Sequence, residues 1–395
     1  MGIELTNEQI YATYDAETWF RSSTSGQVFE ISGPAGSGKT TLVLYIIEKL
    51  GLRKKDVLFC AYMGKAATQL IRNGLPARTI HSAIYDYVGI FSRDKDGNFI
   101  FDKKGNPVKK MVFEKKEALD RDYKLIVIDE GSTVNRAIAE DLLSFGIPVI
   151  VLGDLNQLPP VYGQPIFLQD PDVILTKIMR QNEGNPIIYL SQQVLDGKAL
   201  KVGIYGNSAV MPRENLNQRH FKEADIILTG TNRLRYQVNN MFRETIKKIT
   251  KLNLPHVGEK VVCRKNNWNE CIDKTFYLTN GTTGYIEYLD KERFTENQFI
   301  LDFRPDYVEK KCFKDLRADL KHLYKVPGTY TEEDEKRFYY DKFEFAYAIT
   351  VHISQGSQYN NVLYLSENMM RNKEDAKRLK YTAITRAIDK ITIAI

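Results

Sequence analysis

A glycine-rich segment at residues 33–40 constrains the fold and chemistry of this chain more than any other feature. It reads Gly-Pro-Ala-Gly-Ser-Gly-Lys-Thr, which matches the pattern G-x-x-x-x-G-K-[ST]. An apolar run at 28–31 precedes it, and apolar residues with helical spacing follow it up to residue 50. A strand, a loop and a helix in this order predict a phosphate-binding loop, in which backbone N–H groups and the helix N-terminus surround the phosphates. The residues expected to bind a nucleotide are Gly33, Ala35, Gly36, Ser37, Gly38, Lys39, Thr40 and Thr41.

Two loop side chains and two carboxylates have predicted catalytic roles. Lys39 is expected to reach the β- and γ-phosphates, and Thr40 to offer its hydroxyl to Mg²⁺. A second apolar run, at 125–128, ends in Asp129 and Glu130 at the carboxyl edge of a predicted strand. Asp129 is expected to hold Mg²⁺ through its water shell, and Glu130 to polarise the attacking water. Such a pair is common in solvated loops, but beside this phosphate loop it predicts hydrolysis of a nucleoside triphosphate.

Composition limits the partners and the location of the chain. Its 395 residues carry 56 Lys and Arg against 50 Asp and Glu, and the formal charge of +6 permits a polyanionic partner without indicating one. No run approaches the roughly 18 apolar residues of a membrane helix, and no secretory signal is evident. Because the four cysteines form no C-x-x-C pair, we expect reduced thiols, no zinc site and a cytoplasmic location.

A third apolar run, at 148–152, leads into Gly-Asp-Leu-Asn-Gln at 153–157. With this block the chain resembles the superfamily 1 helicases, and within them the 5′→3′ (1B) branch of RecD-like enzymes and the bacteriophage Dda helicase. The other matching blocks are residues 5–9, 61–67, 79–82, 348–357 and 381–387. The resemblance spans residues 5–391, and the joint order of the blocks is far more specific than any one of them.

The resemblance implies further roles at the nucleotide site. Gln9 would read the adenine edge, and Gln157 would sense the γ-phosphate. Arg180 and Arg386 would reach the phosphoryl oxygens from the second motor domain when the cleft closes. Gly356 is also implied in nucleotide binding. Without the resemblance, Arg180 would be interpreted as part of a surface ion pair.

The resemblance also implies a track for a single strand, contacted mostly through its sugar-phosphate backbone. The implied contact residues are Lys65, Thr79, His81, Thr350 and His352. Taken alone, His81 and His352 would be interpreted as structural histidines. The chain departs from the family pattern at Met63, where threonine is usual, and at Ile353, where lysine is frequent. Either change could remove a nucleic-acid contact; binding is expected to depend strongly on salt.

Residues 84–122 are predicted to form an insertion that contains a β-hairpin. Segments 98–102 and 108–113 flank Lys-Lys-Gly-Asn-Pro, and residues 93–116 hold eight Lys and Arg against four Asp and Glu. In the relatives a pin at this place splits the duplex, so the resemblance implies that Phe99 or Phe101 stacks on the last base pair. A solvated hairpin whose aromatics pack across the strands fits the sequence equally well.

Short apolar segments with tight turns predict a second, β-rich insertion between residues 256 and 340. They lie at 259–263, 276–278 and 284–288, and the relatives have an SH3-like barrel here. The charge-dense stretch 305–340 is expected to form an excursion from that barrel, and a simple exposed, charge-rich segment fits the sequence equally well. The chain is then expected to return to the motor at Phe343.

The expected architecture is therefore α/β, with two RecA-like P-loop motor domains, a β-hairpin pin and an SH3-like β-barrel insertion. The first motor domain is assigned to 1–176, including the insertion at 84–122. The second motor domain is assigned to 177–255 and 341–395, and the barrel to 256–340.

The predicted function is that of an ATP- and Mg²⁺-dependent helicase that acts as a monomer on single-stranded DNA and on single-strand–duplex junctions. The 5′→3′ direction comes from the resemblance alone. A single-strand-binding or replication protein is a candidate partner, no membrane contact is expected, and a viral chain would act in the host cytoplasm. Two alternatives stay open: an RNA-directed helicase or remodeller of the same superfamily, and a P-loop phosphotransferase.

Overall fold

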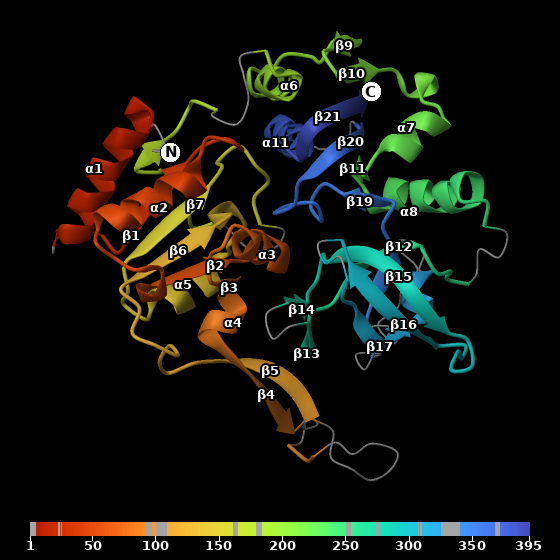
Figure 1. Ribbon diagram of the computed structural model, residues 1–395, viewed down its shortest axis with the longest axis horizontal. Coiled ribbons are helices and arrows are strands. Elements are labelled where there is room, and N and C mark those ends of the chain that lie inside the picture. Colours follow the sequence, from red (N-terminus) through yellow and green to blue (C-terminus); the bar gives the residue numbers. More distant parts are fainter. Residues whose placement is uncertain are drawn as a thin grey trace.

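The computed structural model describes residues 5–22, 24, 26–91, 97–99, 109–160, 165–178, 184–249, 254–272, 276–306, 308, 310–324, 340–367 and 372–395. Two α/β units stand side by side, an antiparallel unit lies below the second in the view of Figure 1, and a β-hairpin extends from the first. Within the described ranges, no helix has both the length and the apolar character needed to cross a membrane.

The first α/β unit is built on a six-stranded parallel sheet with the order β3-β2-β6-β7-β1-β8. Its strands are β1 (Val28–Ser32), β2 (Val57–Ala61), β3 (Ala77–Thr79), β6 (Leu125–Asp129), β7 (Val149–Gly153) and β8 (Val173–Ile174), and its helices are α1 (Asn7–Arg21), α2 (Lys39–Lys49), α3 (Gly64–Arg72), α4 (Ile80–Ile84) and α5 (Arg136–Leu143). Phe59 packs on the face covered by α1 and α2, and its neighbour Leu58 on the face covered by α4 and α5. The predicted strand–loop–helix at 28–50 and the strands at 125–128 and 148–152 are confirmed.

The second α/β unit has a six-stranded sheet with the order β19-β11-β20-β21-β10-β9, in which β9 alone among these strands is antiparallel to its neighbour. Its strands are β9 (Gly203–Tyr205), β10 (Ser208–Met211), β11 (Ile226–Thr229), β19 (Ala348–Thr350), β20 (Tyr359–Leu365) and β21 (Ala387–Ala394), and its helices are α6 (Pro186–Leu195), α7 (Gln218–Glu223), α8 (Asn232–Met241) with the π-helical turn η4 (Phe242–Ile246), and α11 (Lys373–Ile384). Helices α6 and α11 cover one face, and α7 and α8 the other. Two mainly parallel, helix-covered sheets thus form the body of the molecule.

The antiparallel unit consists of a five-stranded sheet with the order β17-β16-β15-β12-β18 and the small pair β13-β14. Its elements are β12 (Lys260–Cys263), β13 (Asn267–Ile272), β14 (Phe276–Leu278), β15 (Thr283–Asp290), β16 (Gln298–Pro305), β17 (Phe313–Asp319), α9 (Leu320–Leu323) and β18 (Phe343–Phe345). The predicted strands at 259–263, 276–278 and 284–288 are found. The expected excursion at 305–340 is wrong for residues 313–319, which form a strand with Phe313 and Leu316 in the core.

The expected return to the motor at Phe343 is also wrong. Residues 343–345 form β18, which pairs with β12 inside the antiparallel sheet, and the second α/β unit resumes only at β19. Buried ion pairs link the second α/β unit to the antiparallel unit. Arg243 Nε donates to Glu259 Oε1 at 2.6 Å, and Arg235 pairs with Glu344. Because a broken buried pair leaves an uncompensated charge, these contacts hold the antiparallel unit on α8 and η4.

The hairpin of the first unit pairs β4 (Tyr85–Phe91) with β5 (Lys109–Lys115) in the register Tyr85↔Lys115 to Phe91↔Lys109. The predicted second strand is found, but its partner is 85–91 and not 98–102. The predicted turn at 103–107 lies outside the described residues. The hairpin therefore starts directly after α4, is longer than the sequence suggested, and projects away from the first sheet (Figure 1).

Candidate active site

The phosphate loop has the backbone conformation that its glycines were expected to provide. Gly36 and Gly38 adopt φ values of 86° and 81°, in the left-handed region that favours glycine, and Gly38 is the N-cap of α2. A Cβ atom on Gly33 would come within 2.7 Å of Ser37 Oγ. Lys39 Nζ donates to the carbonyl oxygens of Gly33 at 2.6 Å and Pro34 at 3.0 Å. The lysine thus lies folded over its own loop, where an incoming phosphate would replace these carbonyls as acceptor.

Asp129 and Glu130 lie at the carboxyl end of β6, two strands away from β1 and its loop. Burial raises the pKa of Asp129 to about 6, and the charge of Glu130 adds to this against the opposing charge of Lys39. Glu130 itself has a φ of 54°, which is uncommon for a residue with a side chain, and its N–H donates to Asp129 Oδ1 at 3.0 Å. Such strain is often found at functional sites.

The carboxylate and hydroxyl at this edge suit a magnesium ion. Mg²⁺ is usually bound in nucleotide sites by one or two protein oxygens together with substrate phosphates, and it keeps several waters. Asp129 is a half-buried carboxylate on which the charge of Lys39 acts against burial and the charge of Glu130, and Thr40 stands in the first turn of α2. These two residues would hold the ion, which would supply positive charge next to the phosphates.

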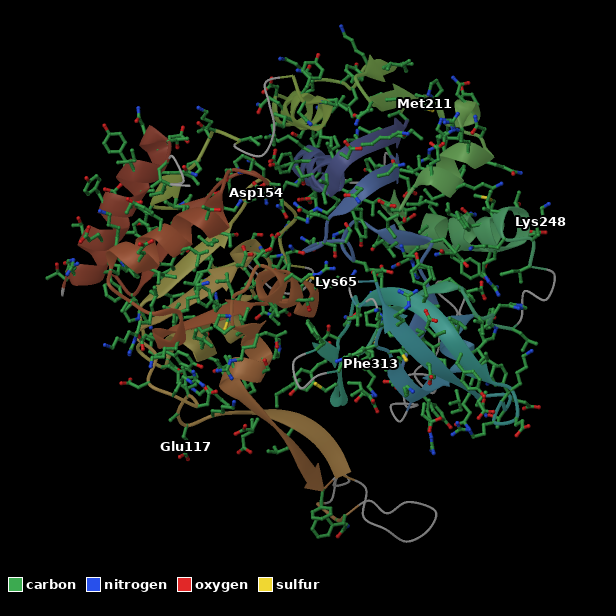
Figure 2. All side chains as sticks on the ribbon, viewed as in Figure 1. Lys65, Glu117, Asp154, Met211, Lys248 and Phe313 are labelled. Carbon is green, nitrogen blue, oxygen red and sulfur yellow. The ribbon has the colours of Figure 1, made fainter. Side chains whose placement is uncertain are left out.

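The loop after β7 reaches across to the second α/β unit. Asp154 is buried, and its Oδ2 accepts a hydrogen bond from Tyr381 Oη of α11 at 2.7 Å and one from Gln157 Nε2 at 3.4 Å. Leu158 N donates to Thr382 Oγ1 at 3.1 Å, and Gln355 Nε2 donates to Leu158 O at 3.0 Å. Figure 2 shows Asp154 on the side of the first unit that faces the second.

Asp154 and Tyr381 were not among the predicted site residues. Both belong to blocks that carried the family resemblance, but they are 227 residues apart and nothing in the sequence pairs them. The sequence signal for these two residues was only that each is a polar residue inside one of the matching blocks. The contact became visible only when the fold brought the loop onto α11.

The two predicted arginines have different outcomes. Arg386 is buried at the end of α11, where its guanidinium donates to Thr382 O at 3.1 Å and Ser357 O at 3.2 Å. It is thus held by the second unit and makes these contacts within that unit. Arg180 lies outside the described residues. Gly356, with φ of 70°, packs against α3, where an added Cβ would come within 3.2 Å of Ala66 Cβ.

Gln9 ties α1 to the phosphate loop. Its amide nitrogen donates to Ser37 O at 3.1 Å, and its amide oxygen accepts from Thr6 N at 3.0 Å in a capping box. The side chain is buried and its donor and acceptor face the protein in this arrangement. Ala35 lines a cavity of about 30 Å³ that Tyr381 and Thr385 also line. The contact between the two α/β units is therefore nearly filled at the phosphate loop.

A larger cavity, of about 480 Å³, lies where all three units meet, and we call it the junction cavity. Its lining includes Lys65 and Arg72 of α3, Asp225, Ser357 and Tyr359 of the second unit, and Lys260, Thr283 and Asp306 of the antiparallel unit. Lys65 Nζ lies 3.4 Å from Thr283 Oγ1. Burial lowers the pKa of Lys65 to about 8, although the charge of Asp306 opposes this shift. Figure 2 shows Lys65 near the middle of the molecule.

Thr79 and His81 lie at the base of the hairpin. Thr79 Oγ1 caps α4 by accepting from Ser82 N at 3.2 Å. The His81 ring packs among Tyr62, Tyr85 and Phe113 with centroid distances of 5.3–5.7 Å, and burial lowers its pKa. These contacts are structural, and His81 couples β2 to the hairpin.

Thr350 and His352 lie at the end of β19. Thr350 is buried and its Oγ1 accepts from Ile353 N at 3.4 Å, while burial lowers the pKa of His352. Ile353, where the family often has lysine, is buried in the core of the second unit. Phe99 is exposed and meets Phe91 edge to face at 5.6 Å, and Phe101 lies outside the described residues.

Comparison with known proteins is consistent with this arrangement. Residues 16–211 match the profile of the AAA domain family, and residues 345–394 match that of the UvrD-like helicase C-terminal domain. The ATP-dependent RecD2 DNA helicase of Deinococcus radiodurans is 27% identical over 91% of this chain and 46% of its own length. The ATP-dependent DNA helicase dda of Enterobacteria phage T4 is 32% identical over 42% of this chain and 38% of its own length. The chain thus matches less than half the length of these relatives.

The fold also matches solved structures. A Pif1 helicase from Bacteroides, in complex with ADP-AlF3 and single-stranded DNA, superposes with a TM-score of 0.52 at 17% identity, over 99% of this chain and 92% of that one. This likeness concerns the fold, in which both parallel α/β sheets take part. The two sequence profiles, the ordered motifs and these relatives together show that the chain resembles the superfamily 1 helicases, and among them the RecD-like and Dda-like members of the 1B branch.

Proposed function

We propose that the chain is an ATP-driven DNA helicase that moves along single-stranded DNA in the 5′→3′ direction and acts as a monomer. The observation that carries this proposal is the contact between the phosphate-loop unit and the second unit, made through Asp154 and Tyr381. A nucleotide site at such a contact can convert binding and hydrolysis into relative movement of the two units. RecD2 and Dda, the relatives described above, are both ATP-dependent DNA helicases, which supports the assignment to DNA.

The geometry supports an in-line hydrolysis at this contact. A water oxygen forms a bond to the γ-phosphorus while the bond to the bridging oxygen breaks, and ADP leaves with that electron pair. Glu130 would accept the proton of the water, and Lys39 would stabilise the charge on the phosphates. Mg²⁺, when held by Thr40 and Asp129, would add to that stabilisation. Arg386, and Arg180 by resemblance, would contribute positive charge from the second unit.

The single strand would run along α3, α4 and the end of β19, over the junction cavity. Lys65 and Arg72 offer positive charge there, Thr79 lines a smaller cavity beside α3, and His81, Thr350 and His352 belong to the motifs of the track. Phosphate contacts of this kind hold a strand without reading its sequence.

We further propose that the hairpin β4–β5 is a pin that separates the strands at a junction, and that the antiparallel unit is the SH3-like insertion of the relatives. The hairpin projects from α4, which belongs to the strand track, and it carries exposed aromatic rings at Phe91, Phe99 and Phe113. On this division, the first motor domain spans 1–176 with an insertion at 84–122, the second spans 177–255 and resumes at β19, and the second insertion runs from residue 256 through β18.

Unwinding of duplexes that carry a 5′ or a 3′ single-stranded tail tests activity and direction together. We expect ATP-dependent separation of the 5′-tailed duplex only, and loss of both ATPase and unwinding in Lys39→Ala. ATPase stimulation by single-stranded DNA that exceeds stimulation by RNA supports the DNA assignment, whereas the reverse order favours an RNA-directed helicase. Wild-type ATPase in Lys39→Ala would remove the nucleotide-site assignment.

A further inference from the structure

The side chain of Gln157 has a fixed orientation that the chemistry of its neighbour dictates. A carboxylate can only accept hydrogen bonds, so the group of Gln157 that faces Asp154 Oδ2 at 3.4 Å must be its NH₂. The carbonyl oxygen of the amide therefore points elsewhere. Within the described part of the chain, this buried oxygen has no hydrogen-bond partner. A buried acceptor without a donor is costly, which is a reason to look for a ligand that supplies one.

Tyr381 determines where that carboxylate lies. Its hydroxyl donates to the same oxygen, Asp154 Oδ2, at 2.7 Å, while Asn156 N donates to Oδ1 at 3.0 Å. Burial and the negative charge of Asp154 raise the pKa of Tyr381, so the hydroxyl keeps its proton and remains a donor. All three side chains of the set Tyr381, Asp154 and Gln157 are buried. The buried, charge-assisted hydrogen bond from Tyr381 to Asp154, at 2.7 Å, holds both side chains in one orientation.

The set lies next to the reacting groups. Tyr381 lines the same small cavity as Pro34 and Ala35 of the phosphate loop. The charges of Glu130 and Arg386 both act on the Tyr381 hydroxyl. The predicted base, the predicted arginine and the phosphate loop thus surround one tyrosine of the second unit.

We propose that Tyr381 and Asp154 are positioning residues for ATP hydrolysis, which hold the Gln157 amide so that its oxygen accepts a hydrogen bond from the attacking water. The inference rests on the proposed function. The water would then donate one hydrogen to Gln157 and pass its other proton to Glu130 as its oxygen bonds to the γ-phosphorus. Because Tyr381 belongs to the second unit and Gln157 to the first, this alignment exists only while the two units are closed. Hydrolysis would thereby depend on closure.

Tyr381→Phe is the direct test, because it removes the hydroxyl and keeps the buried ring. The loop stays docked through Leu158 N with Thr382 Oγ1 and through Gln355 with Leu158 O, so the variant should fold. With saturating single-stranded DNA, we expect kcat for ATP to fall about 10-fold while KM changes less than about 2-fold. Tyr364→Phe, an equally buried tyrosine of the same core, is the matched control and should retain wild-type kcat.

A double variant separates positioning from packing. If Tyr381 acts through Gln157, Gln157→Ala combined with Tyr381→Phe should lie within about 2-fold of Gln157→Ala alone. A further 10-fold loss in the double variant, or wild-type kcat in Tyr381→Phe, would overturn the inference. Should Tyr381→Phe unfold, Asp154→Asn gives the same test, since an amide at 154 no longer dictates the orientation of Gln157. An inactive wild-type chain would instead refute the proposed function.

Discussion

Gly131 follows the predicted catalytic carboxylates and has no room for a side chain. A Cβ atom there would lie 2.2 Å from Val151 Cγ1, in the core of the first sheet. We expect Gly131→Ala to lower the free energy of unfolding by about 1–3 kcal/mol through overpacking. Because Glu130 is the preceding residue, ATPase activity should fall as well. Denaturant unfolding and steady-state ATPase assays measure the two effects.

Val151→Ala removes the clashing methyl group and provides the control for this prediction. The double variant Gly131→Ala/Val151→Ala should be more stable than the sum of the two single effects predicts. Gly26→Ala, where an added Cβ meets nothing within 4 Å, should change stability little. If the effects of the two single substitutions on stability simply added, the close approach of residue 131 to Val151 would not be the cause of the destabilisation.

Asp129 gives a prediction with a defined pH window. Its pKa is raised to about 6 in the folded protein, so the folded chain holds a proton that the unfolded chain releases above about pH 4. This group therefore lowers stability as the pH rises from about 4 to 6, by an amount on the order of 2 kcal/mol. Asp129→Asn keeps the oxygen that accepts from Glu130 N and removes the charge. In magnesium-free buffer we expect it to be more stable than wild type at pH 7.5 and similar to it near pH 4.5.

The control for this pH effect is Asp15→Asn on the exposed face of α1, which should show no such dependence. Unfolding by denaturant at the two pH values measures the difference. Equal stabilisation by Asp129→Asn at both values would contradict the proposed origin in the buried charge.

At the residue scale, local chemistry was predictable and long-range partners were not. The structure has the glycines of the phosphate loop, Lys39 and the Asp129–Glu130 pair on the elements that short sequence patterns predicted. Gln9 was expected to face the nucleotide, but its amide is engaged by Thr6 and Ser37. A glutamine carries both donor and acceptor, and sequence does not tell which neighbour will use them.

Among the elements, the hairpin shows how a correct type of element can have a wrong partner. Segments 85–91 and 98–102 both carry apolar residues near a turn, so the pattern alone allows either to pair with 109–115. The structure pairs 85–91, whose Tyr85 packs with His81 and Phe113 and donates to Asp141. Cross-strand packing at the base of the hairpin thus favours this register.

The loop of the hairpin is where we expect strand separation to depend on aromatic stacking. Since Phe91 and Lys109 are paired, replacing residues 92–108 by Asn-Gly should close β4 and β5 with a two-residue turn. We expect DNA-stimulated ATPase within about 2-fold of wild type and an unwinding rate about 10-fold lower, as the loss of one base–aromatic stack implies. Stopped-flow unwinding of a tailed duplex measures the rate.

A loop of native length in which Phe99 and Phe101 are replaced by serine is the matched control for the loop replacement. The same loss of unwinding would assign the effect to the aromatic rings, and wild-type unwinding would assign it to the length of the loop. If the shortened hairpin unwinds at the wild-type rate, β4–β5 is not the pin.

On the scale of the whole molecule, the organisation into parallel and antiparallel units was predictable, but the boundaries between the units along the chain were not. Strand β16 (Gln298–Pro305) was missed, although buried Phe299, Leu301 and Phe303 alternate along it. Its neighbours along the chain are rich in charge, which favoured an exposed segment. Residues 343–345 were assigned to the motor because the apolar run that starts at Phe343, interrupted only by Glu344, leads into β19. Only sheet pairing shows where one unit ends.

The three units meet at α3, where the antiparallel unit closes over the first α/β unit. An added Cβ on Gly64 would lie 2.1 Å from Thr279 Oγ1, so only glycine allows this approach. The neighbouring Lys65 is buried in the junction cavity with Lys260 and Arg264 nearby, and its pKa is lowered to about 8. The charged groups that act on this lysine, Asp306, Lys260 and Arg264, all belong to the antiparallel unit, so its pKa depends on the assembled molecule.

This dependence leads to a prediction about binding of single-stranded DNA. A phosphate beside Lys65 favours the protonated ammonium form of its side chain. Where Lys65 is neutral in the free protein, binding of DNA is therefore accompanied by uptake of a proton. The affinity for single-stranded DNA is therefore highest below about pH 8 and falls as the pH rises. We expect it to be about 10-fold lower at pH 9 than at pH 7. Lys65→Gln should bind more weakly at pH 7 and lose the dependence, whereas Lys291→Gln, an exposed lysine of the antiparallel unit, should keep it. Fluorescence anisotropy with a labelled oligonucleotide measures the dissociation constant, and an unchanged pH profile in Lys65→Gln would show that the strand does not reach the junction cavity.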